Sequence, residues 1–116
     1  SISLPAYHVG RTALEAGDVT HLHLFENRYK ALIRRVIDGN RLFLFSGGAP
    51  RRGDAATIAL VERCSILNGG KADVICRGVE RVTIAEVWAD DEIPGLCCAR
   101  CTSAIAAPLV MGRRPL

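Results

Sequence analysis

One amphipathic segment, set in an otherwise strand-like sequence, most constrains how this chain can fold. Large apolar residues recur there at the three- and four-residue spacing of a helix that lies on a core. These residues are Tyr29, Leu32, Ile33, Val36 and Ile37. The opposite face is basic, and Gly39, which follows directly, suits a left-handed C-cap. We therefore predict one helix from about Glu26 to Asp38.

The segments around this helix have the short length and the composition of β-strands. Most are apolar or β-branched and end in turn residues, as at Asn68-Gly69-Gly70. The predicted strands are 2–7, 19–25, 41–46, 55–67, 71–76, 79–88 and 94–102. The segments 49–54 and 89–92 show no such pattern and are predicted to be exposed turns. Six or seven short strands with one helix predict a mainly β fold, a small closed or nearly closed barrel.

The length and composition fit one globular domain. The chain has 116 residues, of which 49% are hydrophobic and 23% charged. We place the domain at residues 1–104, followed by a tail or the start of a missing helical lobe at 105–116. No uninterrupted apolar run approaches the ~18–20 residues that cross a bilayer, and the N-terminus lacks the order of a signal peptide. Five cysteines, an odd number, then predict reduced thiols in an intracellular, reducing compartment such as the cytoplasm or an organelle matrix.

The positive charge of the chain is small and dispersed. The formal net charge is +3, and it comes partly from three arginine pairs, Arg34-Arg35, Arg51-Arg52 and Arg113-Arg114. A dedicated nucleic-acid binder usually gathers its charge on one face or element. The charge therefore permits weak contact with acidic partners without arguing strongly for it.

The residues at the start of the predicted helix form a motif. They read Thr20-His21-Leu22-His23-Leu24-Phe25-Glu26-Asn27-Arg28-Tyr29, and after the helix comes Gly39-Asn40-Arg41-Leu42-Phe43. A second block, from Asp73 to Ile84, has the order strand, Gly78, two residues, Arg81, strand. Both blocks resemble the LON domain, the N-terminal substrate-binding region of ATP-dependent Lon proteases. The same domain occurs in stand-alone bacterial proteins and in ubiquitin-ligase components, and the resemblance runs from about Leu4 to Ala99.

The resemblance implies a PUA-like six-stranded pseudo-barrel that binds polypeptide substrates or protein partners and presents them to an attached protease or ligase module. It also implies a structural role for the motif residues, which are His23, Phe25, Glu26, Arg28, Tyr29, Gly78 and Arg81. Phe25 and Tyr29 lie four apart and are expected to pack the helix against the barrel mouth. Glu26 and Arg28 are expected to pair with each other, with Arg81 or with another charge across the junction. RNA binding is the alternative function, since PUA-like barrels include RNA readers.

The sequence contains no pattern of a catalytic or cofactor-binding site. Gly69-Gly70-Lys71 lacks the first glycine and the hydroxyl residue of a phosphate-binding loop. A Gly-x-Ser-x-Gly elbow is also missing. We therefore expect a binding domain with no enzyme activity of its own, so that any protease activity would lie outside this chain.

Two further groups of residues leave alternatives open. His21 and His23 share one face of a predicted strand, where they could be metal ligands or ordinary hydrogen-bonded histidines. We favour hydrogen-bonded histidines, because the nearest candidate for a third metal ligand, Glu26, belongs to the structural motif. Cys98 and Cys101 form a Cys-x-x-Cys pair within a predicted strand, whereas redox pairs of this kind open a helix. We favour small buried thiols over a redox or zinc site there.

Overall fold

The computed structural model describes residues 1–10 and 12–103. Within them it contains strands β1 (Ile2–Tyr7), β2 (Val19–Leu24), β3 (Leu42–Phe45), β4 (Ala55–Ile66), β5 (Ala72–Ala89) and β6 (Cys97–Thr102), helix α1 (Asn27–Ile37) and a 3-10 turn η1 (Asn68–Gly70). The predicted mainly β class with one helix is confirmed. The predicted domain end at 104 and the segment 105–116 lie outside the described residues. No helix in the described ranges has the length and apolar content needed to cross a membrane.

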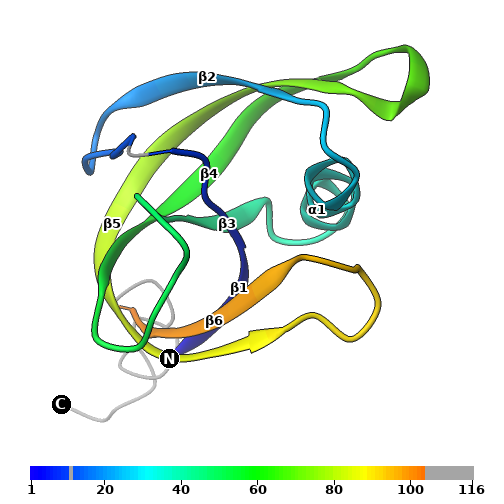
Figure 1. Cartoon of the computed structure of the whole chain (residues 1–116). Coiled ribbons are helices and arrows are strands. Elements are labelled where there is room, and N and C mark those ends of the chain that lie inside the picture. The colour runs from blue at the N-terminus through cyan, green and yellow to red at the C-terminus, as the bar shows by residue number, and fades with distance from the viewer. Residues whose placement is uncertain (11, 104–116) are drawn as a thin grey trace, which may run out of the picture.

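Strand β5 organises the sheet because it is long enough to pair with three other strands. It runs antiparallel to β4 along most of its length, to β2 through residues 72–77 and to β6 through residues 83–89. β4 continues to β3, β3 pairs in parallel with β1, and β1 pairs antiparallel with β6. Five strands therefore close into a barrel, and β2 extends the sheet beside the first half of β5 (Figure 1).

The continuity of β5 corrects the prediction of two separate strands at 71–76 and 79–88. Gly78 lies inside the strand, where the pairing with β4 shifts: Ile58 is opposite Glu80, and Ala59 is opposite Gly78. Val79 is thus the extra residue of a β-bulge, which bends a strand without ending it. In a sequence, glycine is typical of both bulges and turns. The prediction treated Gly78 as part of a turn between two strands and therefore failed here.

Helix α1 lies across the open side of the barrel, between two hairpins that both contact it. Four residues of its predicted apolar stripe are buried and Ile37 is partly buried, which confirms the stripe. Nζ of Lys30 donates to the carbonyl of Gly69 in the β4–β5 turn at 2.7 Å. Arg35 pairs with Asp90, which follows β5, at 2.7 Å. Figure 1 shows α1 end-on between these two hairpins.

The helix ends differently from the prediction. Gly39 has no positive φ, and the left-handed residue is Arg41 instead, with φ 63°. The backbone N–H groups of Gly39 and Arg41 both donate to the carbonyl of Val36, at 3.1 and 2.8 Å. Nε of Arg41 donates to the carbonyl of Val61 at 2.9 Å, so the side chain holds this unusual backbone against β4. The predicted glycine C-cap is therefore wrong.

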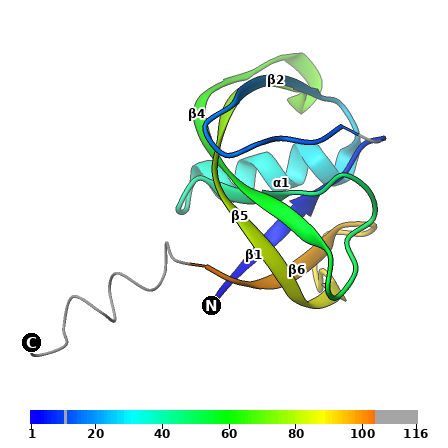
Figure 2. The ribbon, with the colours of Figure 1, turned by 90° about the vertical axis from the view of Figure 1, so that its left-hand side faces the viewer.

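Two clusters of buried apolar side chains stabilise the fold. The larger one lies between α1 and the sheet and includes Leu22, Leu24 and the stripe of the helix. The second fills the half of the barrel that β1, β3, β4, β5 and β6 enclose, and includes Leu4, Ile58 and Ile84. Figure 2 shows the helix packed along one half of the barrel and β6 crossing the other. Because the first cluster takes up the inner face of β2, only its outer face and one strand edge remain for other contacts.

Candidate functional site

Strand β2 leaves one of its two edges without a partner strand. Among the described residues it pairs with β5 alone, from Val19 opposite Arg77 to Leu24 opposite Ala72. Figures 1 and 2 show it on the rim of the barrel, at the opposite end from β6. A free strand edge presents backbone N–H and C=O groups to which another chain can add. We call the unpaired side of residues 19–24 the β2 edge.

The ladder with β5 determines which backbone groups point toward the β2 edge. The N–H of Gly78 donates to the carbonyl of Asp18 at 2.8 Å, so these two residues form a hydrogen-bonded pair. Hydrogen-bonded pairs alternate along antiparallel strands. It follows that Val19, His21 and His23 direct their N–H and C=O groups away from β5. Their spacing of two residues matches that of an incoming strand.

Exposed apolar side chains lie at one end of the sheet, both directly after β2 and across β5 from it. Leu24 lies opposite Ala72, which lies opposite Ile66 on β4. The residue after β2, Phe25, is therefore at the same end of the sheet as the β4–β5 turn. Phe25 is 61% exposed, Ile66 43% and Leu67 41%. A group of large exposed apolar side chains is typical of an interaction surface.

The exposure of Phe25 corrects the prediction that it packs the helix against the barrel. Tyr29 does so without it: this residue is buried, and its hydroxyl donates to the carbonyl of His8 at 2.9 Å and accepts the N–H of His8 at 3.2 Å. The ring of Phe25 stacks on His23 instead, with the ring centroids 6.1 Å apart. The four-residue rule fails because Phe25 precedes the first helical residue, Asn27.

His21 and His23 share a carboxylate partner that the sequence prediction missed. Nε2 of His21 and Nδ1 of His23 lie 3.4 and 2.8 Å from the same oxygen, Oδ1 of Asp73. The hydrogen bond from His23 is the main cause that lowers the pKa of Asp73. The preference for hydrogen-bonded histidines is therefore confirmed. Within residues 1–10 and 12–103, we see no cluster of three or more side chains suited to hold a metal ion.

The motif residues Glu26 and Arg28 contact each other at the start of α1. Nη2 of Arg28 lies 3.2 Å from Oε1 of Glu26, which confirms the mutual pair that the sequence predicts. Nη1 of Arg28 donates to the carbonyl of Gly95 at 3.3 Å, and its guanidinium lies 4.5 Å from the centre of the Tyr29 ring. These contacts connect the helix start to the β5–β6 hairpin.

The motif residues Gly78 and Arg81 lie under the loop that leads into β2. A Cβ atom on Gly78 would overlap the carbonyl oxygen of Glu15, so the loop can approach β5 only because this position is glycine. Thr57 donates to the carbonyl of Leu14 in the same loop, and Nη1 of Arg81 donates to the hydroxyl of Thr57 at 2.9 Å. Arg81 therefore contacts Thr57 and not Glu26, which was one of its expected partners.

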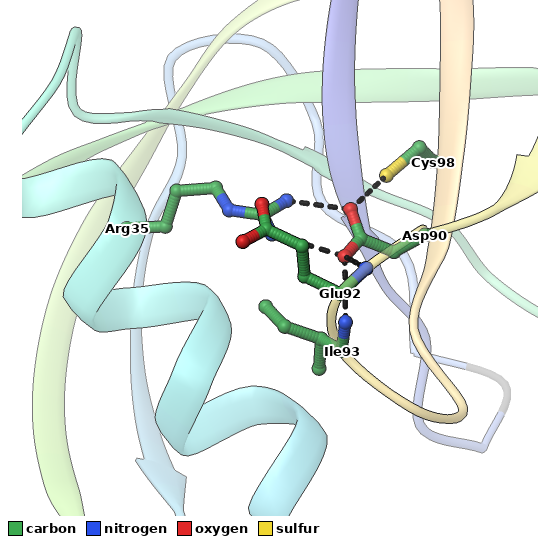
Figure 3. Close-up of polar contacts among 5 residues, drawn as sticks. All are labelled: Arg35, Asp90, Glu92, Ile93 and Cys98. Atoms are coloured by element: carbon green, nitrogen blue, oxygen red, sulfur yellow. Dashed lines mark hydrogen bonds and ion pairs between the residues drawn. The ribbon is translucent and has the colours of Figure 1, made fainter.

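Asp90 attaches the β5–β6 hairpin to α1 (Figure 3). Its carboxylate accepts two hydrogen bonds from Arg35, at 2.7 and 3.0 Å. It also accepts the N–H groups of Ile93 and Glu92, at 2.8 and 3.0 Å, and the thiol of Cys98 at 3.3 Å. The bonds from Arg35 are the main cause that holds the pKa of Asp90 far below its usual range. This cluster contacts the opposite end of α1 from the β4–β5 turn, and its role is structural.

The cysteines are free thiols, most of them inside the protein. Cys76, Cys98 and Cys101 are buried, and Cys64 and Cys97 are half-buried. The burial of Cys98 and Cys101 confirms the preference for buried thiols at those two positions. Burial raises the pKa of Cys76 to about 11 and is the main cause that raises the pKa of Cys98 to about 11. Thiols with such pKa values are poor nucleophiles and poor metal ligands near neutral pH.

The arginine pairs are partly neutralised. One member of each described pair has a carboxylate partner: Arg35 has Asp90, and Nε of Arg51 lies 3.5 Å from Oδ2 of Asp54. The pair Arg113-Arg114 lies outside the described residues. The geometry therefore adds no support for the alternative of RNA binding.

Comparison with known proteins identifies the fold. No protein-family model matches the sequence, and no curated protein matches it. The Lon N-terminal domain protein from Xanthomonas campestris superposes with a TM-score of 0.70 over 88% of this chain, at 24% sequence identity. The N-terminal domain of Mycobacterium avium complex Lon protease superposes with a TM-score of 0.69 over 89% of this chain, at 18% identity. This chain spans 59% and 55% of those two chains. It has the fold of Lon N-terminal domains, as the motif predicts.

Proposed function

We propose that this chain is a non-catalytic domain that binds extended polypeptide segments by adding them as a strand to the β2 edge. One observation carries the proposal: a six-residue strand with a free edge ends beside the exposed side chain of Phe25, and Ile66 and Leu67 are exposed across β5 at the same end of the sheet. Strand addition is a common way in which proteins recognise extended peptides. Main-chain hydrogen bonds form with almost any peptide sequence, so such a site suits a domain that binds many different polypeptides.

The apolar side chains give this edge its selectivity for unfolded protein. Val19, His21 and His23 offer about six backbone groups, and each bond contributes roughly 0.5–1.5 kcal/mol net. Ordering the incoming backbone costs roughly 1–2 kcal/mol per residue and offsets most of that gain. Contacts with Phe25, at the end of the β2 edge, must therefore supply the remaining affinity. Folded proteins bury the apolar residues that would make these contacts, whereas unfolded segments expose them.

The likeness to Lon N-terminal domains supports a place for this binding in proteolysis. We propose that the domain presents unfolded segments to a protease or ligase module that lies outside this chain. The five free thiols support an intracellular, reducing compartment.

The test is a binding measurement with a fluorescein-labelled decapeptide of alternating valine and threonine, followed by fluorescence anisotropy. We expect saturable binding. A second peptide with N-methyl groups on alternate residues keeps the side chains but loses the donors on one edge, and we expect it to bind at least about tenfold more weakly. Equal affinity for both peptides would show that main-chain pairing is not used, and the proposed strand addition would be wrong.

A matched pair of variants places the site on the protein. Phe25→Ser removes the most exposed ring beside the β2 edge and should weaken binding about tenfold, because burial of a phenylalanine side chain contributes roughly 1.5–3 kcal/mol. Trp88→Ser removes another exposed ring, 38% exposed on the part of β5 that pairs with β6, and should leave binding unchanged. Equal effects of the two variants would contradict binding at the β2 edge.

A further inference from the structure

We infer that the β2 edge prefers segments with acidic residues at alternate positions, and that binding such a segment is coupled to proton uptake by His21 and His23. This inference rests on the proposed function, since it concerns which segments the same edge selects. It follows from how the two imidazoles share Asp73 and from the charges on the neighbouring strands.

One ring nitrogen of each imidazole contacts Asp73, and the other ring nitrogen is available to a ligand. His21 directs Nε2 and His23 directs Nδ1 to the carboxylate oxygen. Among the described residues, neither Nδ1 of His21 nor Nε2 of His23 has a hydrogen-bond partner. The side chains are 65% and 49% exposed, so a ligand on the outer face reaches both.

The shared carboxylate determines what the free nitrogens can recognise. A carboxylate only accepts hydrogen bonds, so the nitrogen that faces Asp73 carries the proton and the other nitrogen of a neutral ring does not. After a second protonation, that nitrogen becomes a donor and suits an acidic side chain. An incoming carboxylate favours this charged form of the ring. Each ring that responds takes one proton from the solvent and gains one N–H bond, and no other bond changes.

The strands next to β2 add positive charge on the same face. Directly paired residues point to the same side of a sheet, and His21, Ile75 and Arg63 form one such row across β2, β5 and β4. Within the described chain, Arg63 and Lys71 have no ion-pair partner. Two further basic side chains already have partners: Arg77 pairs with Glu62 at 2.9 Å, and Lys30 of α1 donates to Gly69. The single charge of Asp73 cannot balance both imidazolium groups and these cations.

The strand geometry explains why the acidic residues should alternate. His21 and His23 lie two residues apart on one face of β2, and the residues opposite them on an added strand are also two apart. Two carboxylates at positions i and i+2 therefore both face the imidazoles. The residue between them faces the other side of the sheet, where an apolar side chain suits the buried neighbours Leu22 and Leu24.

The test compares two unlabelled peptides, acetyl-Thr-Val-Glu-Val-Glu-Val-Thr-amide and the same peptide with glutamine in place of both glutamates. Isothermal titration calorimetry at one pH in two buffers of different ionisation enthalpy gives the number of protons taken up. We expect about one proton per glutamate peptide and none for the glutamine peptide. Between pH 8 and pH 6 we expect the glutamate peptide to gain about fivefold in affinity, the size of an exposed ion pair. Asp73 keeps its charge over this range because its pKa is lowered.

Histidine variants separate the inference from the proposed function. The double variant His21→Gln, His23→Gln should lose the proton uptake and the pH dependence while it still binds the glutamine peptide. His8→Gln changes the remaining histidine, a half-buried ring beside Tyr29, and should behave as the parent protein does. Binding of both peptides with equal affinity at pH 6, or without proton uptake, would overturn the inference and leave the proposed function standing. Failure of both peptides to bind would overturn the proposed function itself.

Discussion

Removing the Asp90 carboxylate should destabilise the domain more than any exposed ion pair does. In Asp90→Ala the guanidinium of Arg35 and the N–H groups of Glu92 and Ile93 lose their common acceptor. Asp90 is almost buried, with 9% of its side chain exposed, so water replaces these bonds poorly. The hairpin between β5 and β6 would then lose its main polar attachment to α1.

The expected loss of stability depends on how far Asp90 and Arg35 are shielded from water. Breaking a buried, hydrogen-bonded charge pair costs roughly 3–5 kcal/mol. The side chain of Arg35 is 36% exposed and can regain water, so we expect a smaller loss of about 2–3 kcal/mol in the free energy of unfolding. For a domain of this size, that loss corresponds to a fall in Tm of roughly 10–20 °C.

The pH dependence of this loss follows from the depressed pKa of Asp90. The carboxyl group has its ordinary pKa, near 3.9, in the unfolded chain and a lower one in the folded protein. Its contribution is therefore fully present above about pH 4 and declines as the pH falls toward the folded-state pKa. The difference in stability between the parent protein and Asp90→Ala should shrink in the same range.

Thermal unfolding followed by circular dichroism at pH 7 and at pH 3 measures both effects. Glu86→Ala is the matched control, because it breaks an ion pair with Arg100 of similar length, 3.2 Å, between side chains that are 62% and 43% exposed. We expect this control to lose less than about 0.5 kcal/mol. If Asp90→Ala lost no more than Glu86→Ala, the assignment of Asp90 as the attachment point of the hairpin would be wrong.

Two other changes test the packing of the barrel. Gly78→Ala should lower the free energy of unfolding by about 2–3 kcal/mol in urea titrations, because its Cβ would overlap the Glu15 carbonyl, whereas Gly48→Ala has open space and should have little effect. Cys76, with a pKa raised to about 11 and a fully buried side chain, should resist iodoacetamide in the native protein at pH 7.5 and react after unfolding, as peptide mass spectrometry would show. Equal stability of the two glycine variants, or labelling of native Cys76, would contradict the packing described here.

The local parts of the fold could be predicted from the sequence. Helix α1 was predicted because its apolar residues repeat at a period that requires no knowledge of distant contacts. The pair formed by Glu26 and Arg28 was predicted for the same reason, since these residues are two positions apart. The motif also predicted the fold that the solved structures of Lon N-terminal domains share.

The parts that depend on distant pairing could not be predicted in the same way. Phe25 lies between β2 and α1, and neither the helical nor the strand periodicity predicts the direction of its side chain there. Asp73 is 50 residues from His23, and no spacing rule connects them. The free edge of β2 depends on which strands close the barrel, in particular on the parallel pairing of β1 with β3. The candidate site therefore became visible only in the three-dimensional arrangement.

The composition of β2 is itself an argument that its edge has a partner. Edge strands are usually protected from unwanted pairing by lysine, proline or a bulge. β2 reads Val-Thr-His-Leu-His-Leu and has none of these, and the register shifts of this sheet fall where β5 pairs with β4 and β6. A second copy of this strand would bring histidine side chains, and no carboxylate of its own, to the free ring nitrogens of His21 and His23. An acidic segment brings carboxylates there, so the inferred proton uptake favours its binding and not self-association. The same two residues can therefore favour an acidic client over a copy of this chain.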